Sequence, residues 1–501
     1  MSVDAIAKSC PELSGNFDKW MDCHFSSVAN FIEPIVFYAP KFDIGDTTIA
    51  LPLIIVWMAL GSLIFTFYLG FINLRYFKHA IKIVSGKYDD KKDDGEISSF
   101  QALTASLSGT VGLGNIAGVA IAISVGGPGA ALWMVLMGLF GMCSKFAEVS
   151  LGVKYRQDPI DGDEVFGGPM YYIKPAFEKI KMAKLGTLFA IFFCLACIGG
   201  AIGGGNIFQA NQAYQQVLNI TSFEGTFLHG VFHDFLLTNG WAFGVFLAIL
   251  TGIVTMGGVK IIGKVTSKLI PLMVAIYLGA GLIVIGMNLS AIPEAFSVII
   301  SQAFTPAAGL GAFMGALIQG VKRASFSNEA GLGSAAIIYS ATKTNSHIQQ
   351  GFASMLGPFI DTVVICTLTA LVIILTGAHL DTEGLAGVEL TSRAFGSELS
   401  LFPYILALSV FLFAYSTLIT WSYYAEKCIA YLFGDKKIYL NIFRISFLVF
   451  VVIGCTLELG NVVKVSEALM FVMAIPNLIA MYLLAPHIKR DLKEYISQLR
   501  G

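Results

Sequence analysis

The sequence predicts an all-α protein that crosses a membrane eleven times. Of its 501 residues, 56% are hydrophobic and only 13% are charged, whereas a soluble domain has about 25% charged residues. Apolar runs of about 20 residues, the length that crosses a bilayer as a helix, recur along most of the chain. The 32 basic and 33 acidic residues leave a net charge of −1, so the chain lacks the basic surface that binds a nucleic-acid backbone.

The first 48 residues are predicted to form an arm outside the membrane. They are mixed polar and aromatic, and a short amphipathic helix around residues 25–38 is expected to lie on the membrane surface. The first twenty residues contain no apolar core of signal-peptide length, so a cleaved signal is not indicated. Cys10 and Cys23 lie in this arm and could form a disulfide if it is outside. The other six cysteines lie in or at the ends of apolar segments and are expected to pack as small hydrophobes.

Eleven apolar spans follow the arm, and the seventh is interrupted. They are predicted at 49–74, 99–125, 129–153, 185–217, 238–256, 265–287, 308–339, 348–376, 400–432, 441–457 and 466–486. The chain is accordingly divided into the arm at 1–48, a first span with its loop at 49–98, two halves at 99–306 and 307–488, and a tail at 489–501.

Basic residues predict the orientation in the membrane. Lys and Arg crowd the segments after spans one, three, five and nine and the C-terminus, whereas the alternate loops hold only Arg393 and Lys464. Because basic loops remain in the cytoplasm, the N-terminus is predicted to lie outside and the C-terminus in the cytoplasm.

The second span contains a cluster of glycines between Ser108 and Gly118. Each glycine costs a helix interior about 1 kcal/mol relative to alanine, so this helix is expected to break. Backbone groups freed in hydrocarbon persist only where they are buried or line a polar cavity. The break therefore predicts a ligand site, with close helix packing through small residues as the alternative.

The backbone groups at this break suit two kinds of ligand. The amides of Leu113 and Gly114 lie at the N-terminal end of the following half-helix, where a carboxylate is stabilised. Hard oxygen ligands for an alkali cation are also present. They are the carbonyls of Ser108 and Val111 and the side chains of Thr110 and Asn115. The pattern is typical of the substrate site of a membrane transporter.

The same pattern returns in the seventh span. The stretch Gly112-Leu113-Gly114-Asn115 is echoed by Gly331-Leu332-Gly333-Ser334 after five crossings. An odd number of crossings inverts the second copy, as in the inverted repeats of many secondary transporters. Spans two to six and seven to eleven are therefore predicted to be the two repeats, with span one outside them.

The second break carries ionisable residues at membrane depth. Glu329 lies in the stretch 326–333 beside an amide and a hydroxyl, and intramembrane acids usually mark a transport pathway. Lys322 and Arg323 precede the break and are expected either to pair with Glu329 or to reach an outer vestibule. Ser327 beside Glu329 is also a faint candidate for the nucleophile of an intramembrane hydrolase.

Three other spans contribute candidate ligands. Gln209 follows a glycine run in span four, where its amide could contact a polar ligand or a neighbouring helix. Asp361 is a lone acid in span eight and a candidate cation ligand or proton carrier. Ser416 and Thr417 precede Trp421 by about one turn in span nine, although such hydroxyls often bond to their own helix.

Two spaced pairs have a structural interpretation. Lys145 and Glu148 in span three have the spacing of a helical ion pair and are expected to be structural or gating. His229 and His233, in a predicted outer loop, have the spacing of a metal pair. The sequence offers no third ligand nearby, so they are interpreted as part of a solvated loop.

Longer motifs occur at 110–118, 126–130, 145–149, 167–172, 326–334, 361–362 and 421–424. Together they resemble the alanine-or-glycine:cation symporter family, from about residue 50 to residue 486. The resemblance implies a secondary active transporter that imports alanine or glycine with sodium across the plasma membrane of a prokaryote. Proton coupling and other substrates, such as serine or glutamine, are the alternatives, and a cation channel or an intramembrane hydrolase is a remote one.

That family has the fold of the bacterial leucine transporter, with two broken helices in a five-plus-five inverted repeat. The resemblance implies that the substrate is bound by Thr110, Gly112, Leu113, Gly114, Asn115, Gln209, Phe326, Ser327 and Trp421. It implies that sodium is bound by Ser108, Thr110, Val111, Asn115, Ser327, Asp361, Ser416 and Thr417. No cofactor is expected besides the coupling cation. The expected partners are the amino acid, the cation and the bilayer, and the oligomeric state is left open.

Overall fold

The computed structural model is almost entirely helical and describes residues 17–44, 47–88, 94–157, 165–222, 230–304, 310–381, 385 and 387–500. The N-terminal arm contains α2 (Phe17–Val36) and an antiparallel hairpin of β1 (Lys41–Ile44) and β2 (Thr47–Ala50). The hairpin was not expected from the sequence. Three of the four residues of its second strand, Thr47, Thr48 and Ile49, are β-branched, and such residues pack well in strands.

The first half of the chain is built of helices. Their bounds are α3 (Leu53–Leu69), α4 (Ile72–Arg75), α5 (Phe77–Val84), α6 (Ser99–Thr110), η1 (Leu113–Asn115), α7 (Ala117–Gly126), α8 (Ala130–Lys154), α9 (Pro169–Glu178), α10 (Ala183–Ile202), η2 (Gly203–Ile207), α11 (Phe208–Thr221), α12 (Val231–Thr238), α13 (Gly240–Thr255), α14 (Gly258–Met287), η3 (Leu289–Ala291) and α15 (Ile292–Phe304). A capping box fixes the start of α6: Gln101 N donates to Ser98 Oγ at 3.2 Å, and Ser98 N donates to Gln101 Oε1 at 3.0 Å.

The helices of the second half are α16 (Leu310–Asn328), α17 (Ser334–Tyr339), α18 (His347–Ser354), α19 (Leu356–Pro358), η5 (Phe359–Cys366), α20 (Thr367–Leu375), η6 (Ala378–Leu380), α21 (Val388–Gly396), α22 (Phe402–Phe433), α23 (Lys437–Gly454), α24 (Leu459–Phe471) and α25 (Ala474–Arg500). Two segments, η2 and η5, are π-helical. Because π-bulges often occur at functional sites, both are relevant to the residues beside them.

Within the described residues, seven helical stretches are long and apolar enough to cross a membrane, or up to nine if two bent pairs are each one span. The prediction of a helical membrane protein is confirmed, whereas the number eleven stays a prediction. One reason for the lower count is α3, which has only 17 residues. One bent pair is α6 with η1 and α7, whose axes differ by 60°. The interruption falls at the glycine cluster.

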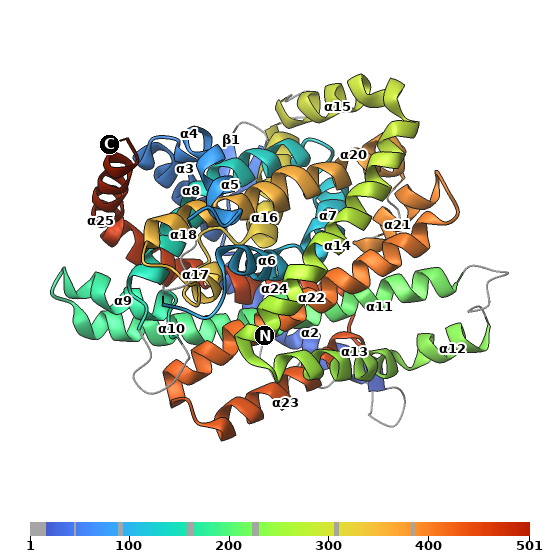
Figure 1. Cartoon of the computed structure of the whole chain (residues 1–501). Coiled ribbons are helices and arrows are strands. Elements are labelled where there is room, and N and C mark those ends of the chain that lie inside the picture. Colours follow the sequence, from blue (N-terminus) through green and yellow to red (C-terminus); the bar gives the residue numbers. More distant parts are fainter. Residues whose placement is uncertain are drawn as a thin grey trace.

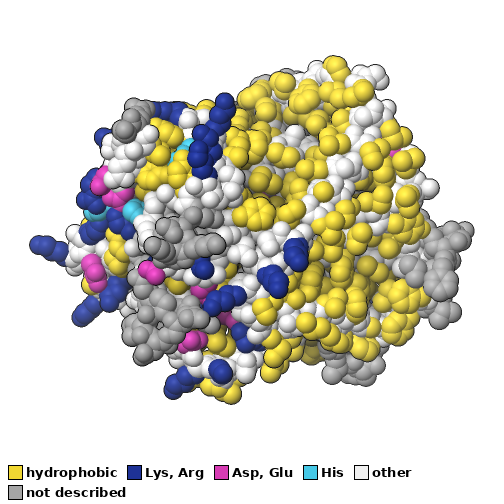
Figure 2. All heavy atoms as spheres, viewed as in Figure 1, with side chains coloured by type: hydrophobic (Ala, Val, Ile, Leu, Met, Phe, Trp, Pro, Cys, Tyr) yellow, Lys and Arg dark blue, Asp and Glu magenta, His cyan; other side chains and the backbone are white. Residues whose placement is uncertain are grey.

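The long helices run between two ends of the molecule (Figure 1). One end carries α9 and the C-terminus, and the other carries α12 and α21. Most Lys and Arg side chains visible in Figure 2 lie toward the first end, while hydrophobic side chains cover much of the remaining face. An extensive apolar surface of this kind is suited to contact with lipid.

The N-terminal arm is anchored to α24 instead of lying free. Asp22 Oδ1 accepts a hydrogen bond from Glu458 N at 2.8 Å, directly before the first residue of α24. Further along α2, Lys464 Nζ lies 3.1 Å from Glu33 Oε2. The carboxylate of Asp22 therefore satisfies a backbone donor at the start of α24.

The cysteines divide as the sequence suggests. Cys23 in α2 is disulfide-bonded, and Cys10, the other cysteine of the arm, lies outside the described residues. The remaining cysteines are free and buried, namely Cys143, Cys194, Cys197, Cys366, Cys428 and Cys455. The spacing of Cys194 and Cys197 therefore reflects helix packing.

Candidate functional site

The first break places backbone groups in the core. After α6 ends at Thr110, the chain is extended at Gly112, and η1 then leads into α7. Gly112 N donates to Asn115 Oδ1 at 3.0 Å. Leu113 N donates to Gln209 Oε1 of α11, also at 3.0 Å. Two amides freed by the break are thus satisfied by side-chain amides, as buried backbone donors require.

Asn115 also connects the first break to the second half of the chain. Its Nδ2 lies 3.0 Å from Ser327 Oγ and 2.6 Å from Asp361 Oδ1. Ser327 Oγ in turn donates to Asp361 Oδ2 at 2.7 Å. These three buried residues, from η1, α16 and η5, form what we call the central cluster. The carboxylate and hydroxyl oxygens that converge here away from water can hold a cation.

Residues that sequence reasoning missed complete the central cluster. Thr362 Oγ1 donates to Asp361 Oδ2 at 2.7 Å, and Thr369 Oγ1 donates to the backbone oxygen of Asn115 at 2.8 Å. Cys366 Sγ lies 3.4 Å from Asn115 Nδ2. All three follow Asp361 within η5 and α20. The sequence feature that could have identified them is their position shortly after a lone intramembrane acid.

The paired hydroxyls of α22 lie beside the first break. Ser108 Oγ donates to Ser416 O at 2.7 Å, which fixes α6 against α22. The hydroxyls of Ser416 and Thr417 each donate to Phe413 O at 2.9 Å, the bonding to their own helix that was the alternative. A Cβ atom on Gly112 would lie only 2.6 Å from Thr417 Oγ1, so this hydroxyl directly adjoins the break.

The two aromatic residues of the predicted site occupy different positions. Trp421 Nε1 donates to Gly109 O and to Glu329 Oε1, both at 3.2 Å. The indole therefore bridges the two broken helices. Phe326 packs edge-on against Phe208 of α11, with ring centroids 5.3 Å apart.

The second break is stabilised by an ion pair from α8. Gly331 and Gly333 have φ values of +87° and +94°, a region that glycine adopts readily. Their amides donate to Glu148 Oε2 at 3.0 and 3.2 Å. Lys145 Nζ lies 3.2 Å from Glu148 Oε1. The predicted helical pair thus also satisfies the backbone of the second break.

The basic residues before the second break have a different partner from the acid that we expected. Lys322 Nζ lies 2.5 Å from Glu467 Oε2, and Arg323 contacts the other oxygen of the same carboxylate. Lys322 also lies over the Phe37 ring, 4.3 Å from its centroid. Of the two expected alternatives, the pairing with Glu329 is wrong, because α24 supplies a different buried acid as the partner of both cations. The sequence feature that could have indicated this partner is that Glu467 is the lone acid of the eleventh predicted span.

All residues of the predicted site are buried. The most exposed of them apart from the glycines is Thr110, at 6%, and its hydroxyl donates to Ser106 O at 3.3 Å within α6. The site is therefore closed to solvent in this conformation. In the part of the chain that the structure describes, no group of three or more His, Cys, Asp and Glu residues is placed to hold a metal.

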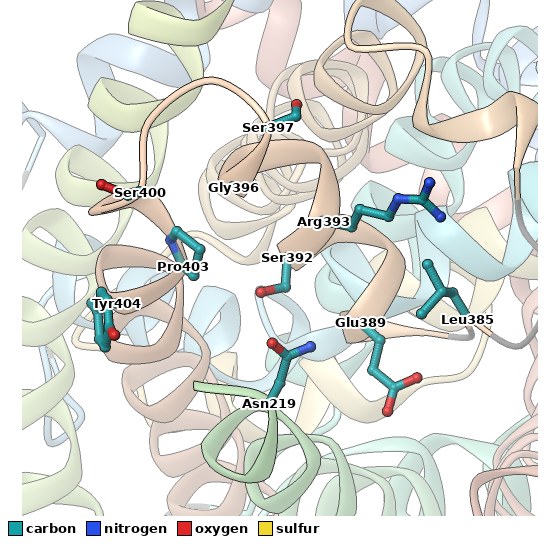
Figure 3. A pocket seen from close by; sticks show the side chains of 10 residues that line it. All are labelled: Asn219, Leu385, Glu389, Ser392, Arg393, Gly396, Ser397, Ser400, Pro403 and Tyr404. Carbon is teal, nitrogen blue, oxygen red and sulfur yellow. The ribbon is translucent and has the colours of Figure 1, made fainter. Parts of the chain in front are cut away.

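A cavity of about 710 Å³ lies near the predicted site but is separate from it. It is lined by Asn219, Leu385, Glu389, Ser392, Arg393, Gly396, Ser397, Ser400, Pro403 and Tyr404. In Figure 3, Asn219 of α11 and Ser392 of α21 point toward each other across it. The buried face of α21 contacts the first break, where Thr391 Oγ1 donates to Ile116 O at 3.2 Å. One short helix therefore separates this cavity from the break.

Residues 40–501 match the family described as the sodium:alanine symporter family. The sodium/alanine symporter AgcS of Methanococcus maripaludis is 41% identical over 443 residues, which cover 87% of this chain and 93% of that protein. The probable sodium/glutamine symporter GlnT of Bacillus subtilis is 35% identical, and the match covers 90% and 89% of the two chains.

The fold is similar to that of a solved structure, MhsT in complex with L-phenylalanine. The TM-score is 0.51 at 16% sequence identity, over 77% of this chain and 87% of that chain. At this identity the similarity concerns the fold alone.

Proposed function

The chain belongs to the sodium:alanine symporter family, and from this premise we propose that it imports a small neutral amino acid together with sodium by alternating access. The observation that carries the proposal is the central cluster. Asn115, Ser327 and Asp361 join the first broken helix, the second broken helix and η5 at buried positions. A ligand bound here would contact both halves of the chain at once, as coupling requires.

The first break supplies the proposed substrate site. The amides of Leu113 and Gly114 would bind the substrate carboxylate at the start of the following half-helix. Gln209 would then turn from Leu113 N toward another group of the substrate. Phe326 and Trp421, together with Thr110, Gly112, Asn115 and Ser327, would limit the side chain to a small one.

The central cluster supplies the proposed cation site. The carboxylate of Asp361 and the hydroxyl oxygen of Ser327 are hard ligands of the kind an alkali cation prefers. The side-chain oxygen of Asn115, which accepts from Gly112 N while its Nδ2 faces the other two residues, would join them once the amide turns over. A second site would use the Ser416–Thr417 pair, the carbonyls of Ser108 and Val111 and the side chain of Thr110. Membership of the family favours sodium as the coupling ion, and a proton on Asp361 is the alternative.

The finer topology is part of the same proposal. We propose eleven spans, the N-terminus outside, the C-terminus in the cytoplasm, and inverted repeats at 99–306 and 307–488. The gathering of Lys and Arg toward the end with the C-terminus supports this orientation (Figure 2).

Two other classes of function fit the site less well. A channel needs a filter or charged rings around a continuous pore, whereas the residues of the predicted site are buried. A hydrolase needs a nucleophile beside a base. The hydroxyl of Ser327, the candidate nucleophile, donates to Asp361 instead of Glu329, an arrangement that suits a cation ligand better.

Purified protein in liposomes is expected to accumulate labelled alanine when sodium is higher outside. The physical reason is that a cation that favours one conformation drives the bound substrate with it. Uptake of alanine, glycine, serine and glutamine is compared under inward sodium, proton and potassium gradients. Uptake that neither a sodium nor a proton gradient stimulates would contradict symport. Uptake that only a proton gradient stimulates would indicate that the coupling ion is a proton bound to Asp361.

Substitution of Gly112 by alanine is expected to weaken substrate binding by roughly 10- to 100-fold, because small displacements at a positioned site have large effects. The new Cβ would lie 2.6 Å from Thr417 Oγ1 and 3.0 Å from Gln209 Oε1. Alanine at Gly118 is the matched control, since this glycine lies in α7 outside the proposed site and its nearest neighbours, Arg323 Cδ and Leu113 O, would lie at 4.0 Å. Sodium-dependent binding of labelled alanine to detergent-purified protein measures both. Equal affinities for the two variants would contradict the proposed roles of Thr417 and Gln209.

A further inference from the structure

At one end of the molecule, the segment that enters the first broken helix meets the segment that leaves the second. Residues 94–97 precede α6 and residues 340–344 follow α17, and they form a parallel bridge between Ile97 and Thr342. Backbone amides cross the bridge in both directions. Those of residues 96 and 97 donate to the oxygen of residue 341 at 2.8 and 3.2 Å, and those of residues 343 and 344 donate to the oxygens of residues 97 and 94 at 2.8 and 3.1 Å.

Arg156, just after α8, holds both segments from the side. Its Nη1 donates to Thr342 O at 2.7 Å and to Ser340 O at 3.3 Å. Its Nη2 donates to Asp94 O at 3.0 Å and to Thr344 O at 3.1 Å. A planar guanidinium can direct several donors at fixed angles, which the compact ammonium of lysine cannot do. One side chain thus joins the cytoplasm-directed ends of both broken helices in the predicted orientation.

Gly95 is independent evidence that the main chains of the two segments pack in direct contact. Its φ is +137°, and a Cβ atom at this position would lie 2.5 Å from the carbonyl carbon and oxygen of Thr342 and 2.6 Å from Lys343 N. Only a residue without a side chain allows this approach of two main chains. We call Arg156 together with residues 94–97 and 340–344 the latch.

The latch lies at the end of the molecule that carries the C-terminal part of α25. Lys154, two residues before Arg156, pairs with Asp491 of that helix. A cavity of about 380 Å³ adjoins the latch and is lined in part by Asp94, Arg156 and Thr344. Water can therefore take over the hydrogen bonds of these groups when the latch separates, which keeps the cost of opening small.

We propose that Arg156 is a positioning residue that holds the transporter closed at its cytoplasmic end by joining the two broken helices. This inference rests on the proposed function, because only alternating access requires those two helices to separate and rejoin at this end. Without the guanidinium, conformations open at this end become more populated. Sodium applied from the opposite side binds the remaining closed fraction, so its apparent affinity falls in proportion to that fraction.

Four variants test the latch in the full-length protein. Arg156→Ala removes the donors, Arg156→Lys keeps the charge, and Gly95→Ala separates the main chains while leaving Arg156 in place. Arg393→Ala is the matched control. Arg393 also donates to a carbonyl and a carboxylate, both of Asp381. It follows the C-terminal end of the candidate span His347–Leu375, whereas residues 340–344 of the latch precede the start of that span.

A cysteine at Ser106, buried in α6 with 4% exposure, reports on opening. Each variant is combined with Ser106→Cys in inside-out vesicles, and mass spectrometry follows modification of that peptide by a charged thiol reagent. We expect Arg156→Ala and Gly95→Ala to raise the modification rate about tenfold, a size common for conformational coupling. Arg156→Lys should raise it less and Arg393→Ala should leave it unchanged. In uptake assays, the sodium concentration for half-maximal uptake should rise about tenfold in Arg156→Ala.

A residue that only stabilises the fold would give another result. Yield and thermal stability would fall, while the modification rate of folded protein and the half-maximal sodium concentration would equal those of the wild type, and this would overturn the proposal. Faster modification in Arg156→Ala and Gly95→Ala in a protein that transports no amino acid would instead support the latch and contradict the proposed function.

Discussion

Replacing Asn115 by alanine is expected to lower the apparent affinity for both sodium and the amino acid by roughly 100-fold. The substitution removes the donor to Ser327 and Asp361, and it removes one of the two acceptors of Gly112 N, which also donates to Thr110 O at 2.9 Å. Each buried polar group that loses its partner costs about 1–3 kcal/mol, and every 1.4 kcal/mol corresponds to a factor of about ten in affinity. Binding of labelled alanine over a series of sodium concentrations measures both constants.

The matched control is Asn206→Ala. Asn206 is also a fully buried amide, but it donates to Phe447 O at 2.7 Å, away from the central cluster. Its loss should reduce thermal stability and leave both affinities within about twofold of wild type. If Asn115→Ala and Asn206→Ala behave alike, the central cluster is a structural network and the cation site lies elsewhere.

The sequence was informative where local chemistry determines the structure. The interruption after Thr110 follows from glycines within a few residues of one another, and the positive φ values at Gly331 and Gly333 follow from the same local property. Asn115, Ser327 and Asp361 were each identifiable as polar residues in apolar spans. That they belong to one cluster depended on the resemblance to a known family, because no local signal relates residues in three separate spans.

The partners of these residues were harder to predict. Arg323 pairs with Glu467 instead of the nearby Glu329 because packing of α16 against α24 decides which acid is in reach. The bond from Leu113 N to Gln209 likewise depends on how α11 lies beside the first break. Arg156 gave no signal, since an arginine in a basic loop has many solvated alternatives. Such choices are made by tertiary packing and not by the local sequence.

Glu148→Ala is expected to destabilise the protein by about 3–5 kcal/mol, the usual cost of removing one partner of a buried ion pair. The substitution leaves Lys145, which is 1% exposed, without its carboxylate. It also removes the acceptor of the Gly331 and Gly333 amides, so the second break loses its support at the same time. Chemical denaturation in detergent, followed by tryptophan fluorescence, measures the change in unfolding free energy.

Two further variants separate the ionic contribution of Glu148 from its support of the second break. Glu148→Gln keeps an oxygen for the Gly331 and Gly333 amides but leaves the Lys145 charge unpaired. The double variant Lys145→Met/Glu148→Gln removes both charges, and well-packed neutral replacements of a buried pair are often nearly neutral in stability. It should therefore recover most of the lost stability and retain alanine binding. A double variant as unstable as Glu148→Ala would show that the charges themselves hold the second break, and that the two amides need a carboxylate and not merely an acceptor.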